Sequence, residues 1–382
     1  AILTRFLIPF ESAEEESRVA ATPETVKKFL SVGCSVSIEK DAGVKSGFAD
    51  KDYAEIGAKV IPRADFDALK KTDCLLCVQA PNSSYLKKLN EGTLTIGLLS
   101  PYGNKALATD LFFQKLSAIS LELLPRISRA QSADALSSQA NIAGYKSVLI
   151  AAKELDRYFP MLMTAAGTGQ PAKGVILGAG VAGLQAIATA KRLGAVVYVS
   201  DIRPAVKEQV ESLGAKFIEP PNSEDKPTES GGYAKQASES FLASQRQQLS
   251  DQLAQADVAI CTAQVPGKKA PRLINEDMLD RMRSGSVVID LAIDQGGNCS
   301  DTKSGSTNIR KGVKLIGASN LACSVPNHAS SLYSRNLLAL IEPFIKEGQL
   351  NFNFEDELIS GSLLSLQGQI RFPDLMNFGE KN

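Results

Sequence analysis

Short apolar runs alternate with amphipathic stretches over residues 1–136, and this alternation predicts a parallel α/β sheet. The runs expected to form its strands are AILTRFLI, SVSIEK, DCLLCVQ, GTLTIGLLS and LSAISLELL. A helix should begin after Thr22, because Thr22 can cap the first turn and the next residue, Pro23, suits the first helical position. Gly33 follows this helical stretch and predicts its end.

A second alternating series covers residues 174–320. Its expected strands are GVILGAG, AVVYVSD, AKFIEP, DVAICTA, SVVIDLA and VKLIGAS, with helical stretches between them. Residues 220–238 are rich in Pro, Gly, Ser and charge, and they predict a surface loop. A long helix over about residues 135–158 should lead from the first series into the second.

The chain returns to helical periodicity after residue 325, in LYSRNLLALIEPFIKEG, and then ends in short strand-like runs. A tail that follows a complete nucleotide-binding unit often packs back on the first domain, and we expect that arrangement here. The predicted organisation is two Rossmann-like, doubly wound parallel sheets, one formed by residues 1–136 with 326–382 and the other by residues 137–325. A length of 382 residues is enough for two such domains.

Composition and charge narrow the classes of function. The chain is 44% hydrophobic and 22% charged, as soluble globular proteins are. Its 42 basic residues balance 42 acidic ones, so charge gives no support for a nucleic-acid or anionic-membrane partner. No apolar run reaches the roughly 20 residues that span a bilayer, and no signal-peptide pattern opens the chain. The chain begins without Met in an expected strand, which suggests a piece of something larger.

Cysteine and histidine limit the available chemistry. The six cysteines lie mostly in apolar, strand-like surroundings, which favours a reducing compartment. Cys74 and Cys77 form CLLC, but the leucines between them predict a buried strand, and no metal or redox site is predicted. His328 is the single histidine, which nearly excludes histidine-based catalysis unless that residue performs it.

A glycine motif, Gly178, Gly180 and Gly183, marks a candidate nucleotide site. An apolar strand precedes it, a helical pattern follows from about Val181, and the next strand ends in Asp201 at about the expected spacing. Gly178 permits the tight turn, Gly180 lets the backbone approach a pyrophosphate, and Gly183 lets the helix pack close to the strand. The helix N-terminus offers N–H groups to the phosphates. The motif therefore predicts dinucleotide binding; the alternative is a structural turn without phosphate.

The residues at the strand ends indicate which dinucleotide binds. A carboxylate at Asp201 accepts hydrogen bonds from ribose hydroxyls and repels a 2′-phosphate, which favours NAD over NADP. Arg203 could instead hold a 2′-phosphate, but beside Asp201 we interpret it as an exposed loop arginine. Ile202 between them is an expected cofactor contact. Ala263 and Gln264 follow another strand at the carboxyl edge, where ligands bind in this fold, so they are expected contacts too.

A cluster of polar residues, RISRAQSAD, precedes the long helix. It packs two arginines, an amide and a carboxylate into a few positions, although one capping residue is enough to begin a helix. An N-cap region with solvated arginines would account for Ser132 or Asp134, but not for the whole cluster.

Taken together, these segments resemble proton-translocating nicotinamide nucleotide transhydrogenase, in its peripheral NAD(H)-binding component. The motifs that carry the resemblance are RISRAQSADALSSQANIAGYKS, MTAAGT, GAGVAGLQAIATAKRLGA, KEQVESLGAKF, GGYAK, PGKKAP, GSVVIDLA and GGNC. They extend from RVAATP at Arg18 to about Asn336, which is nearly the whole chain. The nearest relative by fold is alanine dehydrogenase, so the resemblance implies an alanine-dehydrogenase-like α/β fold.

The resemblance implies roles for the polar cluster. Arg126, Asp134 and Ser137 would hold the carboxamide of the NAD(H) nicotinamide and set its angle. Gln131 would reach toward the nicotinamide ribose of NADP(H) on a separate partner component. Hydride transfer between two nicotinamides removes no substrate proton, so it needs orienting groups and a short distance rather than a general base. Further NAD(H) contacts are implied for Ile127, Ser128 and Arg129.

Other implied contacts lie near the glycine motif. In the family a mobile loop closes over the bound nucleotide, and SGGYAKQ matches that loop. Gly232 would give it backbone freedom, and Tyr233 would cover the site and exclude water; the alternative is an exposed loop tyrosine. Gln245, on the helix that follows, and Val181 are further implied contacts.

An alanine-dehydrogenase-like amino-acid oxidoreductase is the alternative function. In that family a lysine and a histidine contact the substrate, whereas this chain has Gln79 at the lysine position and no histidine in GLLSPYGN. Arg18 is retained, and Asp294 matches the dehydrogenase's acid, which transhydrogenases tend to lack. His328 lies in another segment, which favours a structural role. A bare NAD-sensing module is the third alternative, but it gives no reason for the cluster at residues 126–137.

The implied function is the NAD(H)-binding part of a Re/Si-specific NAD(P)⁺ transhydrogenase. It would position NADH for hydride transfer to NADP⁺ on a partner component, coupled to proton translocation by a membrane component outside this chain. The resemblance also implies a homodimer. It would be a soluble peripheral part of a membrane-bound enzyme, on the side of the bacterial cytoplasm or the organelle matrix.

Overall fold

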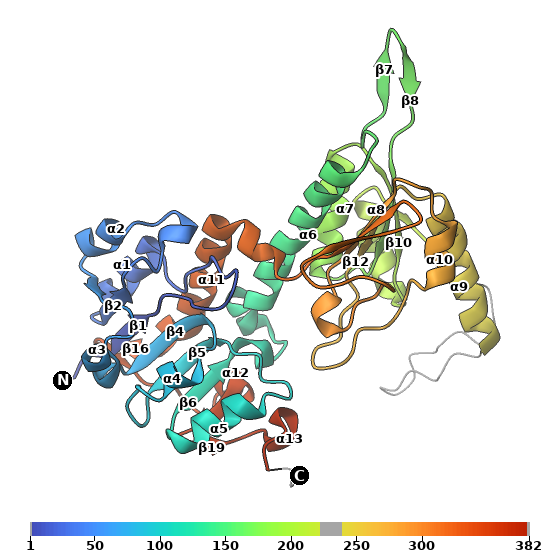
Figure 1. Ribbon diagram of the computed structural model, residues 1–382. Coiled ribbons are helices and arrows are strands. Elements are labelled where there is room, and N and C mark those ends of the chain that lie inside the picture. The colour runs from blue at the N-terminus through green and yellow to red at the C-terminus, as the bar shows by residue number, and fades with distance from the viewer. Residues whose placement is uncertain (1, 222–238, 380–382) are drawn as a thin grey trace. The chain divides into compact units, whose positions relative to one another are not determined.

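The computed structural model describes residues 2–221 and 239–379, and the chain divides into two compact units. Unit 1 comprises residues 1–139 and 322–382, and unit 2 comprises residues 140–321. Each unit is built around its own largely parallel sheet with helices on both faces (Figure 1). The predicted fold class, two Rossmann-like α/β sheets, is confirmed.

The sheet of unit 1 has the order β19-β18-β6-β5-β4-β1-β2-β3. Its parallel strands are β1 (Arg5–Ile8), β2 (Ser35–Glu39), β3 (Lys59–Ile61), β4 (Cys74–Gln79), β5 (Leu94–Leu98) and β6 (Ser117–Ser120). Two antiparallel strands from the end of the chain, β18 (Leu363–Leu366) and β19 (Gln369–Ile370), extend the sheet beside β6. The final 61 residues therefore complete the sheet that the first residues begin.

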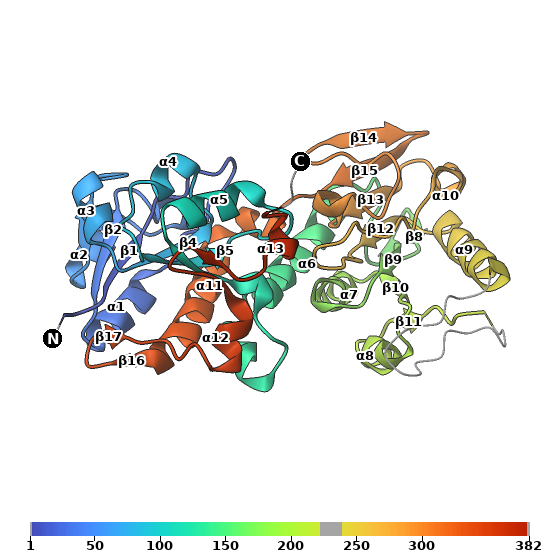
Figure 2. The ribbon, with the colours of Figure 1, turned by 90° about the horizontal axis from the view of Figure 1, so that it is seen from below.

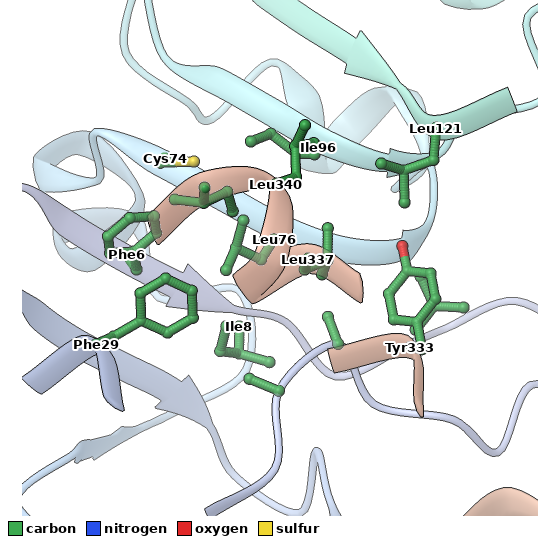
Figure 3. Close-up of a cluster of buried hydrophobic side chains, with 14 of the residues drawn as sticks. Phe6, Ile8, Phe29, Cys74, Leu76, Ile96, Leu121, Tyr333, Leu337 and Leu340 are labelled. Atoms are coloured by element: carbon green, nitrogen blue, oxygen red, sulfur yellow. The ribbon is translucent and has the colours of Figure 1, made fainter. Parts of the chain in front are cut away.

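Side chains alternate across this sheet as the pleat requires. Phe6 and Ile8 of β1 enter one buried cluster, while Leu7 enters the cluster on the other face. Figure 3 shows the first cluster, where Tyr333 and Leu337 of α11 meet the strand side chains. The helices of this unit are α1 (Pro23–Ser31), α2 (Asp50–Glu55), α3 (Phe66–Lys71), α4 (Ser83–Leu86), α5 (Lys105–Phe113), α11 (Pro326–Ile341), α12 (Glu357–Ser362) and α13 (Pro373–Met376).

Local signals in unit 1 act as predicted. The Thr22 hydroxyl accepts a hydrogen bond from the Thr25 N–H and caps α1, and Gly33 follows the helix with φ of 93°. Cys74 and Cys77 are buried in β4, and all six cysteines are free thiols. His328 is exposed in the first turn of α11, so the structural role expected for it is not supported by burial.

The sheet of unit 2 has the order β11-β10-β9-β12-β13-β15-β14. Its parallel strands are β9 (Lys173–Leu177), β10 (Val196–Ser200), β11 (Lys216–Phe217), β12 (Val258–Cys261), β13 (Val287–Asp290) and β15 (Val313–Gly317), and β14 (Thr307–Arg310) is antiparallel. The chain moves outward in one direction from β9 to β11 and then restarts beside β9 with β12. The strand order therefore reverses between β9 and β12, which is where ligands bind in such sheets.

Helices cover both faces of this second sheet, as Figure 2 shows from below. The α6, α7 and α8 helices pack on one face, and α9 and α10 pack on the other. The bounds are α6 (Ala135–Glu154), α7 (Val181–Arg192), α8 (Lys207–Ser212), α9 (Glu239–Ala254) and α10 (Glu276–Arg281). The helix α6 ends four residues before the expected 158, because the chain turns there to bury Leu155 and Phe159 and Pro160 follows.

A hairpin, β7 (Leu162–Thr164) with β8 (Gly167–Gly169), projects from unit 2 (Figure 1). Its strands are three residues long and largely exposed, so no apolar run predicted it. In the described part of the chain, no helix combines the length and the apolar character that crossing a membrane requires.

Candidate nucleotide site and polar segment

Two glycines of the motif are required by the fold itself. Gly178 follows β9 with φ of 101°, and a Cβ there would lie 2.6 Å from the Thr262 hydroxyl. A Cβ on Gly183 would lie 1.9 Å from the Gly178 carbonyl oxygen, so only glycine lets α7 begin this close to β9. The tight turn and the close helix packing that the sequence predicts are both present.

Gly180 has no such requirement. Its φ is −77°, which any residue adopts, and no described atom lies within 4 Å of a Cβ built there. Gly180 is the N-cap of α7, a helix of 12 residues, and no side chain caps that N-terminus. The missing side chain leaves the first N–H groups of α7 open to an approaching group.

The helix α6 supports the motif from behind. A Cβ on Gly144 would lie 2.2 Å from the Ala182 carbonyl oxygen, so α6 contacts the first turn of α7 directly. The Gln185 amide also donates to Asn141 Oδ1 over 3.1 Å. Sequence reasoning missed Gly144, although a glycine inside a long helical pattern costs about 1 kcal/mol and therefore signals close packing.

Asp201 stands at the end of β10 beside the glycine turn. Its Oδ2 accepts from the Ala179 N–H at 2.8 Å, which ties the turn to the strand end. Arg203 occupies the rest of the carboxylate: its backbone N–H and Nε donate to Oδ1 at 2.8 and 3.0 Å, and its Nη2 donates to Oδ2 at 2.9 Å. Arg203 is thus bound to Asp201 and is not the solitary loop arginine that we expected.

The environment keeps Asp201 ionised. Burial alone would raise the pKa of Asp201, but the hydrogen bonds from Arg203 and Ala179 and the guanidinium charge outweigh it and hold the pKa below its ordinary value. Only 5% of the Asp201 side chain is exposed, against 54% of the Arg203 side chain. Two other expected contacts, Ile202 and Val181, expose their side chains to solvent.

The loop after β12 forms the other wall of the turn. The Thr262 hydroxyl donates to the carbonyl oxygens of Leu177 and Gly178, both at 3.0 Å. The expected contacts Ala263 and Gln264 come next, and the Gln264 amide donates to the Leu291 carbonyl at 2.7 Å. The structure therefore brings this wall, the glycine motif and Asp201 together at the carboxyl edge of one sheet.

Asn298 holds this wall in place. Its Oδ1 accepts from the Ala263 N–H at 3.0 Å, and its Nδ2 donates to the carbonyls of Ala263 and Pro271 at 2.9 and 2.8 Å. Asn298 is itself held by the buried carboxylate of Asp290, which accepts its backbone N–H. Sequence reasoning missed Asn298; the signal was an amide in the segment GGNC that follows β13.

Asp294 lies on the same loop and is exposed. Its two carboxylate oxygens contact the Ser319 hydroxyl at 2.9 and 2.7 Å. The carboxylate that matches the dehydrogenase's acid is therefore already engaged by a neighbouring hydroxyl.

The polar cluster lies on unit 1, mostly in a short 3-10 helix, η3 (Ser128–Ala133), that precedes α6. Ala130 and Ala133 are buried, and the Asn336 amide of α11 donates to the Ser132 carbonyl at 2.8 Å. Exposed polar residues of the cluster are therefore presented from a segment that is anchored at its apolar positions.

The side chains of this cluster divide into two groups. Arg126 and Gln131 are exposed, and neither side chain has a hydrogen-bond partner within the described residues. Asp134 caps α6: its Oδ1 accepts from the Ser137 N–H at 3.0 Å and its Oδ2 from the Ser137 hydroxyl at 2.6 Å. Arg129 is paired with Asp356 at 2.9 Å. The remaining expected contacts are Ile127, which is half-buried, and Ser128, which is exposed.

A buried charged group, Glu16 with Arg18, occupies the interior of unit 1. The Arg18 Nη2 lies 2.7 Å from Glu16 Oε1, and its Nη1 donates to Gln139 at 3.0 Å. The Gln79 amide also donates to Glu16, at 2.8 Å. Burial would raise the pKa of Glu16, but hydrogen bonds and charge from Arg18 outweigh it and lower the pKa to about 2.

Three glutamates fill the carboxyl edge of the unit 1 sheet. Each accepts two backbone N–H groups from neighbouring strand ends, so internal carboxylates take the donors that a ligand would use. Glu39 accepts from Phe10 and Ala64, Glu11 from Val78 and Gln79, and Glu122 from Leu99 and Ser100.

Some expected contacts are not described or stand apart from these groups. Gly232 and Tyr233 lie outside the described residues, and so does nearly all of the segment predicted as a surface loop. Gln245 is half-buried on α9. Within residues 2–221 and 239–379, no group of three or more His, Cys, Asp or Glu side chains could hold a metal ion.

Comparison with known proteins gives consistent matches over the whole chain. The alanine dehydrogenase/PNT N-terminal domain matches residues 7–143, and the C-terminal domain of the same family matches residues 147–373. A chain of NAD(P) transhydrogenase subunit alpha from Rhodospirillum rubrum is 43% identical over 98% of this chain and 100% of its own length. The transhydrogenase structure from Sinorhizobium meliloti has a TM-score of 0.87 at 42% identity, covering 96% of this chain and 100% of that one. An L-alanine dehydrogenase structure has a TM-score of 0.79 at 26% identity, covering 98% of both chains.

Proposed function

The chain belongs to the alanine dehydrogenase/PNT family, and from this premise we propose that it is the NAD(H)-binding component of proton-translocating NAD(P) transhydrogenase. It binds NADH in unit 2 and positions the nicotinamide for direct, Re/Si-specific hydride transfer to NADP⁺ on a separate component. A membrane component outside this chain couples that transfer to proton translocation. The resemblance indicated by the motifs is confirmed by the relatives' names; the finer steps are our proposal.

Gly180 is the observation that carries nucleotide binding. Neither backbone conformation nor packing within the described residues requires glycine there, whereas Gly178 and Gly183 are required by the fold. A pyrophosphate lying against the N-terminus of α7 would need the space that a side chain at Gly180 would fill. Asp201 at the adjacent strand end supplies the carboxylate for the adenosine ribose, which favours NAD(H).

The polar segment suits hydride transfer better than acid–base chemistry. The side chains of Arg126 and Gln131 are exposed and have no partner in the described chain, so they are available to orient nucleotides. Asp134 and Ser137 already bind each other, so in contacting the carboxamide they would act as a preformed pair. Positioning two nicotinamides requires hydrogen bonds and a short distance, and both nucleotides supply the reacting atoms themselves.

The amino-acid oxidoreductase alternative fits the interior of unit 1 poorly. A substrate carboxylate needs a cation that can bind it, and here the Arg18 guanidinium is taken by Glu16 and Gln139. The residue at the lysine position, Gln79, donates to the same Glu16. The chain's own carboxylate thus occupies the place where a substrate carboxylate would bind Arg18.

The proposed complex contains two copies of this chain together with the NADP(H)-binding and membrane components, and it lies at the surface of a membrane in a reducing compartment. The hairpin β7–β8 supports self-association, because Met161 and Met163 beside and within it are 60% and 76% exposed. Molar mass from light scattering tests this point: Met163→Asp should lower the mass toward the 40.7 kDa of one chain. An unchanged mass would remove the hairpin from the interface.

Replacing Gly180 tests the nucleotide site. Gly180→Ala should leave the fold and Tm intact, because the new methyl group meets no described atom, yet it should weaken NADH binding at least about tenfold. Gly174→Ala, in β9 with equally open space around its Cβ, is the matched control and should bind NADH normally. NADH fluorescence reports binding without tryptophan background, since the chain has none. Equal affinities in all three proteins would place the cofactor elsewhere.

Replacing Gln131 tests hydride transfer. Gln131→Asn should leave NADH affinity nearly unchanged, because the proposed partner of Gln131 is the nucleotide on the other component. Combined with the remaining transhydrogenase subunits of the Rhodospirillum rubrum relative, the variant should transfer hydride at least about tenfold more slowly, since misplacement by ~1 Å can cost about a hundredfold. Transfer at the full rate would show that the segment is only a helix start.

A further inference from the structure

The contact between Asp201 and Arg203 leaves the carboxylate fully used. An ionised carboxylate has about four sites for accepting hydrogen bonds. The Ala179 N–H takes one of them, and the backbone N–H, Nε and Nη2 of Arg203 take the other three. Ribose hydroxyls that bind Asp201 must therefore displace the Nε and Nη2 of Arg203.

The same contact holds Arg203 in one direction. The guanidinium folds back on a carboxylate two residues before it and presents its Nε–Nη2 edge to that carboxylate. A guanidinium binds phosphate through the same kind of edge, with paired N–H groups to two oxygens. The side chain is 54% exposed, so it has room to turn outward once the carboxylate is gone.

Building on the function proposed above, we propose that Asp201 excludes NADP(H) by restraining Arg203 as well as by its own charge. The chain carries a latent 2′-phosphate ligand, the Arg203 guanidinium, which the Asp201 carboxylate keeps occupied. Asp201 then determines specificity in two ways: it accepts the ribose hydroxyls of NAD(H), and it withholds the neighbouring cation that would bind a 2′-phosphate.

This restraint differs measurably from simple repulsion. If repulsion by Asp201 is the only barrier, removing the carboxylate helps NADPH equally whether or not Arg203 is present. If Arg203 is a restrained ligand, the gain requires the arginine. A cycle of Asp201→Ala, Arg203→Ala and the double variant separates the two, because neighbouring residues that act together give non-additive effects.

The experiment measures the binding of NADH, NADPH and adenosine 2′,5′-bisphosphate to the full chain. Asp201→Ala should bind NADPH and the bisphosphate about tenfold or more tighter than wild type does, as a new charge-assisted contact provides. In the double variant most of this gain should disappear. Arg203→Ala alone should gain nothing toward NADPH, because Asp201 still repels the 2′-phosphate.

Asp201→Asn provides a second cycle in case Asp201→Ala disturbs the turn. Asparagine retains an acceptor for the Ala179 N–H but lacks the charge that holds the guanidinium. Circular dichroism and Tm identify the folded variants. An NADPH gain that is equal with and without Arg203, or no gain in any variant, would overturn the restraint while leaving NADH binding intact. A wild-type chain that binds neither nucleotide would overturn the proposed function and this proposal with it.

Discussion

Glu11 is a buried carboxyl group whose protonation should control the stability of unit 1. It lies just after β1, and its Oε1 accepts the N–H groups of Val78 and Gln79 at 3.1 and 2.8 Å. Burial raises the pKa of Glu11 from 4.5 to about 8; these hydrogen bonds oppose the rise, and the charge of Glu16 adds to it. Glu11→Gln keeps an oxygen acceptor and removes the titrating proton.

The sign of the effect follows from the direction of the shift. The folded chain holds Glu11 protonated up to a higher pH than the unfolded chain does, so stability is complete below pH 4.5 and is lost as pH rises through about 8. At about 1.4 kcal/mol per pKa unit, the shift corresponds to about 5 kcal/mol. Glutamine has no such loss, so the stability of Glu11→Gln relative to wild type should increase from pH 5 to pH 9.

Calorimetry over this pH range measures the effect. For a unit of roughly 200 residues, 1 kcal/mol corresponds to about 2–4 °C in Tm, so the difference in Tm should grow by on the order of 10 °C. Glu14→Gln, on an exposed residue of the same loop, controls for the loss of a charge. NADH affinity should be unchanged, since Glu11 lies outside the proposed nucleotide site. A Tm difference that stays constant from pH 5 to pH 9 would refute this account of Glu11.

Three further substitutions separate folding from function in the same chain. Gly183→Ala should destabilise unit 2 by about 1–3 kcal/mol or more, because its Cβ would overlap the Gly178 carbonyl, and a lowered Tm together with weaker NADH binding would show it. Asn298→Ala should weaken NADH binding, since the Ala263 N–H and C=O lose their partner; Asn298→Asp, which restores only the acceptor, should fall between the two in a titration. Asp134→Ala should cost about 1 kcal/mol through the lost cap of α6, measured by denaturation, and should slow hydride transfer beyond that loss; a transfer rate equal to wild type would limit Asp134 to capping.

Much of the fold was predictable because its strands are buried on both faces. Runs such as CLLCVQ and SVVIDL have no alternation to hide them, and turn residues bound them on both sides. The hairpin β7–β8 was not predictable, since its six strand residues are mostly exposed and include two glycines. The antiparallel edge strand β14 was missed for a similar reason: its alternating, partly exposed residues form no apolar run.

The candidate site was predictable in its residue types but not in its contacts. The spacing of the motif indicated Gly180 and Asp201, because the tight turn, the helix and the next strand end impose it. The sequence could not show that Arg203 folds back on Asp201, since that depends on side-chain rotamers at the strand end. Nor could it show that Asn298, far along the chain, would clamp Ala263 from the loop after β13. Such contacts arise only when the sheet brings distant loops to one edge.

The two sheets themselves explain why one unit is suited to a dinucleotide and the other is not. Their central strands follow the same order, so each has a reversal point at its carboxyl edge, between β1 and β4 in unit 1 and between β9 and β12 in unit 2. In unit 1 the Glu11 carboxylate accepts the N–H groups at the end of β4, so the donors at the reversal point are already used. In unit 2 the corresponding place holds Gly180, whose missing side chain leaves the N-terminus of α7 open. A duplicated architecture thus acquires one binding site through an internal anion at one reversal point and an omitted Cβ at the other.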